Sequence, residues 1–270
     1  MRTWLSFHFY PLDTQDVFLT RALRPFLTQY IWPRPEARAF FIRFEDEKGP
    51  HIRLRLHGEA GWLAETLRPA LEGWFVDRGE CVEVAYASEP ERFGGAAGLA
   101  LAEEHFHLST RVTLDRLAQE QRTQGDLLFD ALRMQLLMAL AAGLSRDKAA
   151  WYFGQLYTQW LPLFFSPTDG QPLAEDGRTA LATQFATSLG GQKEVLRTAF
   201  EALWKAAGTG QFDATQPEWR RWLRGNELIL KEFGDQLDKA LPSLLHLTNN
   251  RLGVNNQDEV YLCYVLAHTL

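Results

Sequence analysis

The stretch "HIRLRLH" at positions 51–57 alternates strictly between apolar side chains and guanidinium or imidazole side chains. A period of two predicts a β-strand, because successive side chains of a strand point to opposite faces of its sheet. The apolar positions are Ile52, Leu54 and Leu56, and the positions between them hold His51, Arg53, Arg55 and His57. We therefore expect one face of this strand to join a core and the other face to be cationic.

The same kind of alternation predicts three further strands, at 4–10, 39–45 and 81–87. Apolar residues at helical spacing predict helices at 13–30 and 61–78. The segment "DEKGP" before position 51 has turn chemistry that suits a hairpin connection. The resulting order, β-α-β-β-α-β, is ferredoxin-like, and its two helices cover one face of the sheet and leave the other face open.

The rest of the chain has helical spacing almost throughout, with helices expected at 99–121, 125–143, 146–161, 177–189, 193–207, 219–241 and 258–268. No second strand-rich stretch is visible in the sequence. We therefore expect an α+β protein in which residues 1–270 form a single domain. Its ferredoxin-like half, 1–95, is expected to pack against a mostly helical half, 96–270.

Composition narrows the class of protein. The chain has 28 lysines and arginines against 34 aspartates and glutamates, which gives a net charge of −6 and argues against nucleic-acid binding. The N-terminus lacks the features of a signal peptide, and no apolar run approaches the roughly 18 residues that span a membrane. Cys81 and Cys263 form no C-x-x-C pair and are expected to be buried thiols. A soluble protein of the reducing cytoplasm is expected.

A cationic strand in an acidic protein suggests an anionic ligand. The alternation in neighbouring strands is expected to place His8 and Arg43 on the face that carries Arg53 and Arg55. If the helical half closes over this face, the result is a cleft whose guanidinium groups suit a carboxylate or a phosphate. The alternative is structural: these arginines pair with carboxylates such as Glu89 or Glu91 and hold the two halves together.

Three tracts carry a resemblance to a known family. They are "FFIRFEDEKGPHIRLRLHG" at 40–58, "EPERFGG" at 89–95 with "AEEHF" at 102–106, and "HLTNNRLG" at 246–253. In this order and separation they resemble the C-terminal domain of lantibiotic dehydratases, which also occurs as the thiopeptide-type bacteriocin biosynthesis domain. The resemblance covers nearly the whole chain; its first and last tracts are specific, whereas "RFGG" alone is weak.

The resemblance implies a reaction. Full-length members of this family join a large domain, which uses glutamyl-tRNA to glutamylate Ser and Thr of a precursor peptide, to this smaller domain, which expels glutamate and leaves dehydroalanine or dehydrobutyrine. A chain of 270 residues resembles a free-standing elimination component. Its expected partners are a ribosomally synthesised precursor peptide and a separate glutamylation protein, and no cofactor is expected.

The residues that match the family's elimination arginines are Arg53, Arg55 and Arg92, and the match to its catalytic histidine is His246. Expelling glutamate requires removal of an α-proton, stabilisation of the developing enolate and departure of a carboxylate. Guanidinium groups suit the negative charge, and an imidazole suits proton transfer. Each residue also has a structural interpretation: Arg92 anchors the turn at Gly94, and His246 is a core histidine.

Four further residues are candidates for substrate binding: Arg43, His51, Asn250 and Arg251. His51 either lends a second imidazole or makes a structural hydrogen bond from its strand. Asn250 shares a helical face with His246 if the segment is helical. Asn250 and Arg251 either position substrate or cap the segment.

Two other functions stay open. One is a pyridine synthase, which closes the central ring of a thiopeptide by a formal [4+2] cycloaddition; retention of the arginine and histidine set favours elimination instead. The other is a non-catalytic peptide-binding scaffold, which a departure from the family pattern keeps open: Leu108 precedes Ser109 where members often have Asp-Ser. His105 and His107 are two residues apart, do not share a helical face and make no convincing metal site.

Overall fold

The computed structural model describes the chain except residues 120–121, 167–172 and 212–216. The chain forms two compact units. The sheet-bearing unit consists of Met1–Arg122 and Glu232–Gly253, and the helical unit consists of Thr123–Lys231 and Val254–Leu270. The expected α+β class is confirmed, with a sheet at the N-terminus and helices in the C-terminal half. The sheet-bearing unit extends beyond the expected half 1–95, because two later helices fold with the sheet.

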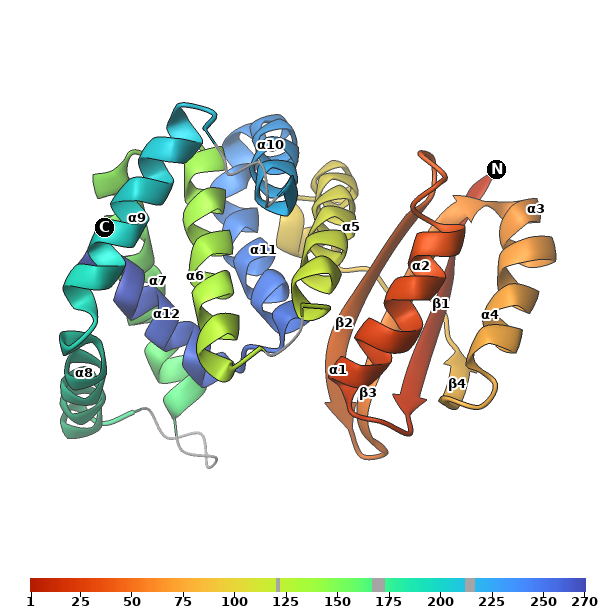
Figure 1. Ribbon diagram of the computed structural model, residues 1–270, viewed down its shortest axis with the longest axis horizontal. Helices are drawn as coiled ribbons and strands as arrows, with labels where there is room; N and C mark the ends of the chain where they lie inside the picture. Colours follow the sequence, from red (N-terminus) through yellow and green to blue (C-terminus); the bar gives the residue numbers. More distant parts are fainter. Residues whose placement is uncertain (120–121, 167–172, 212–216) are drawn as a thin grey trace. The chain divides into compact units, whose positions relative to one another are not determined.

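The sheet has four strands in the order β2-β3-β1-β4, and every neighbouring pair is antiparallel (Figure 1). The strands are β1 (Arg2–Pro11), β2 (Arg38–Asp46), β3 (Gly49–Glu59) and β4 (Gly79–Glu83). This is the ferredoxin-like arrangement that the pattern predicts. The last strand ends at Glu83, earlier than position 87, and the chain then runs without regular structure toward the 3-10 helix η3 (Pro90–Phe93).

Two broken helices cover one face of the sheet. The first consists of α1 (Gln15–Phe18), η1 (Leu19–Leu23) and α2 (Arg24–Tyr30), and the second of α3 (Ala60–Trp62), η2 (Leu63–Leu67) and α4 (Arg68–Phe75). Both η segments are π-helical, and both end just before an Arg-Pro pair at the start of the next helix. Proline donates no backbone hydrogen bond, so the local change of hydrogen-bonding register has a cause in the sequence. The apolar face of β3 lies in this core.

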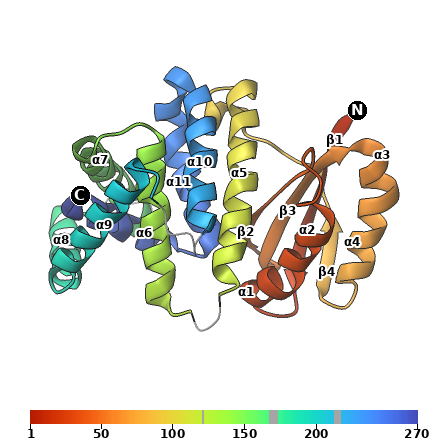
Figure 2. The ribbon, with the colours of Figure 1, turned by 45° about the horizontal axis from the view of Figure 1, so that its top comes forward.

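Helices α5 (Ala96–Leu117) and α11 (Leu237–Leu252) pack against each other and against β2 (Figure 2). Their side chains accept hydrogen bonds from the outer edge of β2. The Ala39 amide donates to Nδ1 of His107 (3.0 Å), and the Phe41 amide donates to the Thr110 hydroxyl (3.4 Å). The Arg43 amide donates to Oδ1 of Asn250 (2.9 Å). Side chains of the two helices therefore occupy an edge that would otherwise be open.

The helical unit consists of α6 (Gln124–Ala141), α7 (Arg146–Phe165), α8 (Glu175–Gly190), α9 (Lys193–Gly208), α10 (Pro217–Glu232) and α12 (Asn256–Thr269). Trp222 of α10 is fully buried, and its indole donates to the Met134 carbonyl oxygen of α6 (2.9 Å). Apart from the helix expected at 219–241, the expected helices are present with shifted ends; Gln121, the expected end of the first, lies outside the described residues. In the described part of the chain no helix has the length and apolar character to cross a membrane.

The sequence pattern is wrong at two places. The helix expected at 219–241 is two helices, because Gly234 has φ +50° and the short turn η4 (Gly234–Gln236) separates α10 from α11. Cys263 is buried as expected, but Cys81 is exposed because β4 is an outer strand.

Candidate functional site

A pocket of about 110 Å³ in the sheet-bearing unit brings together Arg53, Arg55 and Arg92. We call it the arginine pocket. Its wall is built from β2, β3, the segment 86–89, η3, α5 and α11. The cationic face of β3 therefore faces a pocket that sheet and helix residues enclose, as the alternation predicts.

Two of these guanidinium groups lie on β3. Arg55 is 8% exposed and donates to the carbonyl oxygens of Phe7 (3.3 Å) and Leu54 (3.1 Å). Burial, with a contribution from the Arg53 charge, lowers the pKa of Arg55 to about 10. Arg53 is half-buried and lies over the Phe44 ring, 3.3 Å from its centroid. Within the described residues neither Arg53 nor Arg55 forms an ion pair, whereas the carboxylate of Glu89, which also lines the pocket, pairs with Arg92.

Arg92 enters the pocket from η3. Its Nη1 pairs with Glu89 (2.8 Å), and its Nη2 donates to the Ser243 hydroxyl of α11 (3.4 Å). Gly94 ends η3 with φ +85°, and a Cβ atom there would lie 2.6 Å from the Gln236 side chain. The turn beside Arg92 therefore requires glycine, which fits the structural interpretation of "ERFGG" without excluding a contact between Arg92 and a ligand.

His246 lies on α11 and is half-buried. Its neighbour Leu247 lines the arginine pocket, whereas His246 is not among the lining residues in the part of the chain that the structure describes. Ser243, nearly one turn earlier, contacts Arg92, and Asn250, about one turn later, bonds to β2. The fold thus brings α11, the helix that carries His246, to the border of a pocket whose arginines lie far away in the sequence.

The expected placement of Arg43 is wrong. Arg43 pairs with Ile52 in the register of β2 and β3, and it therefore points to the helix-covered face, opposite to Arg53. Its guanidinium contacts Asp16 (2.6 Å) and the Arg251 carbonyl oxygen (3.1 Å). The pairing register of β2 with β3 decides to which face of the sheet Arg43 points. Alternation within β2 alone does not give this register.

Asn250 joins α11 to β2. Its side-chain amide accepts from the Arg43 amide (2.9 Å) and donates to the Arg43 carbonyl oxygen (3.0 Å). This pair of bonds imitates the pairing of a neighbouring strand. The geometry therefore gives Asn250 a positioning role, holding the helix of His246 against the sheet.

His51 is fully buried beside Arg53. Its Nε2 accepts from Nε of Arg53 (3.3 Å), and its Nδ1 lies 3.2 Å from the Gly49 carbonyl oxygen, a pair of bonds that fits the tautomer protonated at Nδ1. The imidazole rings of His51 and His8 stack at 4.9 Å. These contacts orient Arg53 and agree with the structural interpretation of His51.

Arg251 lies behind the wall of the pocket. It is fully buried, with its guanidinium 4.7 Å from the centroid of the Phe106 ring, and Phe106 lines the pocket. Nη1 donates to the Leu247 carbonyl oxygen (2.8 Å), while Nε and Nη2 have no hydrogen-bond partner. Burial lowers the pKa of Arg251 to about 9. This charge adds to the positive potential around the pocket.

Two residues of this region are not among the sequence candidates. Tyr86 lines the pocket, and its hydroxyl donates to Oε1 of Glu103 on α5 (2.8 Å). Burial raises the pKa of Glu103, and burial together with this hydrogen bond raises the pKa of Tyr86. Glu103 belongs to the "AEEHF" tract at 102–106, and this tract is the feature of the sequence that points to it. Tyr86 lies in the irregular segment after β4, where alternation carries no information.

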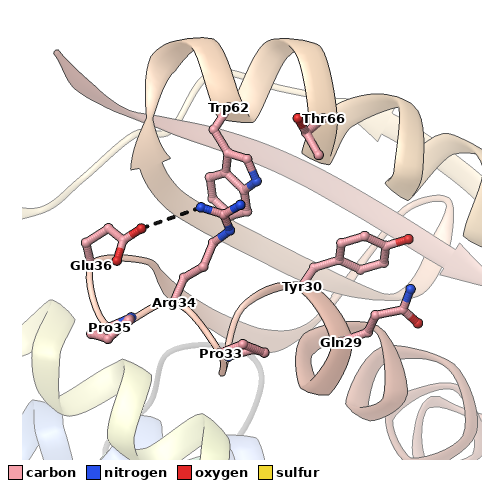
Figure 3. A pocket seen from close by; sticks show the side chains of 8 residues that line it. All are labelled: Gln29, Tyr30, Pro33, Arg34, Pro35, Glu36, Trp62 and Thr66. Atoms are coloured by element: carbon pink, nitrogen blue, oxygen red, sulfur yellow. Dashed lines mark ion pairs between the residues drawn. The ribbon is translucent and has the colours of Figure 1, made fainter.

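A larger hollow lies elsewhere on the same unit, beside Arg34 and Trp62 (Figure 3). Its volume is about 580 Å³. Arg34 lies 4.5 Å from the centroid of a Trp62 ring and pairs with Glu36 (3.6 Å). Because this guanidinium already has an anionic partner, the smaller arginine pocket is the stronger candidate for binding an anion.

Comparison with solved structures shows a shared fold. MibB, a tRNA-dependent lantibiotic dehydratase from Microbispora sp. 107891, is 20% identical with a TM-score of 0.65 over 99% of this chain and 28% of that chain. TbtD, a pyridine synthase from thiomuracin biosynthesis, is 17% identical with a TM-score of 0.73 over 98% of this chain and 96% of that chain. TsrL is 19% identical with a TM-score of 0.64 over 100% of this chain and 94% of that chain.

The chain thus spans 28% of the length of the MibB chain and nearly the whole length of TbtD. No curated relative matches the sequence. The sequence model of one family, described as the C-terminal part of the lantibiotic biosynthesis dehydratases, matches residues 4–270. With nearly every residue matched and the fold shared, this chain belongs to the lantibiotic dehydratase C-terminal family.

Proposed function

We propose that this chain eliminates glutamate from glutamylated Ser or Thr of a precursor peptide and leaves a dehydroamino acid. The observation that carries the proposal is the convergence of Arg53, Arg55 and Arg92 on one pocket. Arg53 and Arg55 form no ion pair within the described residues. A pocket with uncompensated guanidinium groups favours an anion, and departing glutamate supplies carboxylates.

The chemistry assigns a part to each group. Removal of the α-proton leaves an electron pair that forms the Cα=Cβ bond, while the Cβ–O bond breaks and glutamate departs as a carboxylate. The arginines stabilise the charge that grows on the enolate and on the leaving group. His246, on the helix that borders the pocket, transfers a proton. This is lyase-type chemistry that requires no redox step.

The proposed partners follow from the reaction. The substrate is a ribosomally synthesised precursor peptide, and a separate protein supplies the glutamyl group. The present sequence corresponds to 28% of the MibB chain. The proposal includes both partners. It also includes that the protein acts in the cytoplasm and requires no cofactor.

One specific observation favours a second function. The chain matches TbtD, a pyridine synthase, over nearly the full length of both proteins. A cycloaddition would use dehydroalanine residues already present in the peptide and would expel no glutamate. The ion-pair-free guanidinium groups of Arg53 and Arg55 favour elimination over this alternative. The scaffold alternative rests on Leu108, which is half-buried beside Ser109.

A direct test uses a synthetic peptide whose serine carries a glutamyl ester. We expect mass spectrometry to show release of glutamic acid and formation of dehydroalanine without added tRNA, nucleotide or metal. Arg34→Ala serves as a control, because it removes a guanidinium group from the hollow beside Trp62. An intact ester together with ring closure of a peptide bearing two dehydroalanines would replace elimination by the pyridine-synthase function. Peptide binding without either reaction would leave a scaffold.

A further inference from the structure

Tyr86 lies in the wall of the arginine pocket, and Glu103 is bonded to it from α5. The Tyr86 ring is packed by Trp4 (4.8 Å between centroids) and Phe40 (6.1 Å). Its hydroxyl is directed to Glu103 by the 2.8 Å hydrogen bond. Tyr86 therefore lies at the pocket in a fixed orientation, with a carboxylate behind it.

Charged groups from several elements surround this pair. Arg55 of β3 lies over the Tyr86 ring, 5.7 Å from its centroid, and the Arg251 charge of α11 also acts on Tyr86. Glu89 lies in the segment after β4, and Glu104 is the neighbour of Glu103 on α5. The positive charges of Arg55 and Arg251 favour negative charge on the Tyr86–Glu103 pair. Burial favours a neutral phenol and makes the Glu103 carboxylate a better proton acceptor than an exposed one.

We propose that Glu103, acting through the Tyr86 hydroxyl, takes the α-proton of the glutamylated residue. The Cα–H bond breaks and its proton joins the Tyr86 oxygen, while the Tyr86 hydroxyl proton moves to Oε1 of Glu103. The electron pair left on Cα forms the Cα=Cβ bond and expels glutamate from Cβ. Glu103 ends protonated and returns its proton to solvent after product release. This inference rests on the proposed elimination.

The geometry favours this pair over His246 for the first proton transfer. Tyr86 lines the arginine pocket, whereas His246 does not belong to its lining within the described residues. A general base has to reach the proton that it removes, directly or through one intervening group. The assignment gives the departing carboxylate to His246, so the two proton transfers have separate groups.

Glu103→Gln is the sharpest test. The glutamine oxygen still accepts the Tyr86 hydrogen bond, so a structural role would leave glutamate release unchanged, whereas loss of the base should slow it about 10²-fold or more. Tyr86→Phe should slow release to a similar extent while it keeps the ring packing. Glu104→Gln is the matched control, because it removes a neighbouring carboxylate that pairs with Arg38 (2.7 Å).

A pH profile separates proton transfer from positioning. The wild type should lose activity as the pH falls through the raised pKa of Glu103, because the base becomes protonated. Glu103→Gln should remove this acid limb from its residual activity, and Glu103→Asp should restore it in part. Thermal unfolding checks that each variant is folded.

The outcomes distinguish the inference from the proposed function. If Glu103→Gln releases glutamate at the wild-type rate with the wild-type acid limb while Arg53→Ala is slow, the base assignment is wrong and elimination stands. If the wild type itself leaves the glutamyl ester intact, both are wrong. Slow release by Glu103→Gln and Tyr86→Phe without the acid limb, with normal release by Glu104→Gln, supports the assignment.

Discussion

The two faces of strand β3 have opposite physical characters. Ile52, Leu54 and Leu56 are fully buried in an apolar core beneath two helices. On the other face, Arg53 and Arg55 line a pocket without a carboxylate partner among the described residues. Burial of apolar surface stabilises the fold, whereas keeping unpaired charge away from water costs stability. Neighbouring positions on one strand can therefore serve stability and chemistry separately, and substitutions should separate the two.

The largest expected effect is on the chemical side. His246→Ala should slow glutamate release from a glutamylated peptide by about 10²–10⁴-fold, because a positioned proton-transfer group contributes that much. The rate is measured by mass spectrometry of released glutamate. His268→Ala, in α12 of the helical unit, is the control and should leave the rate unchanged. A His246→Ala protein with full activity would remove this histidine from the reaction.

The apolar face should respond in the opposite way. Leu54→Ala removes a side chain with 0% exposure and should lower the free energy of unfolding by about 2–5 kcal/mol. Denaturant unfolding measures the change. The folded fraction should still release glutamate at a normal rate per molecule. A loss below about 1 kcal/mol would mean that this face contributes less to the core than its burial implies.

Arg53→Ala tests the cationic face directly. It should slow glutamate release by about 10²-fold, the cost of removing one preorganised donor. The free energy of unfolding should fall by about 1–3 kcal/mol at most, because Nε2 of the buried His51 loses its donor but no carboxylate among the described residues loses an ion pair. A destabilisation of about 3–5 kcal/mol would instead support the structural interpretation of this arginine.

The smallest expected effect concerns pH. Burial, together with Arg53, Arg55 and His51, lowers the pKa of His8 from 6.5 to about 4. The unfolded chain therefore binds a proton that the folded protein resists, and His8 lowers stability as the pH falls from about 6.5 toward 4. His8→Gln should remove this part of the pH dependence in unfolding measurements at several pH values. An unchanged slope would show that neither burial nor the neighbouring charges lower the pKa of His8 in the folded protein.

The periodicity of single segments predicts much of the sheet-bearing unit. It is least reliable where contacts between distant segments decide which way a side chain points. Alternation in β3 assigns Arg53 and Arg55 to one face, because the period of a strand is a local property. Alternation within β2 predicts the wrong face for Arg43, because its orientation depends on the pairing of β2 with β3. The approach of α11 to the pocket depends on contacts between segments far apart in the chain. The sequence pattern does not predict the position of Tyr86, because the segment that holds it follows no regular period.

The hydrogen bonds from the β2 edge to helix side chains limit how a peptide can approach. Many peptide-binding proteins add their ligand to a sheet as one more strand, which requires free backbone donors along an edge. Here His107, Thr110 and Asn250 already occupy the donors of Ala39, Phe41 and Arg43. Burial lowers the pKa of His107 to about 4, so its imidazole remains a neutral acceptor near pH 7. A peptide therefore cannot extend the sheet along residues 39–43 of β2, and under the proposed function the glutamylated side chain has to enter the pocket by another route.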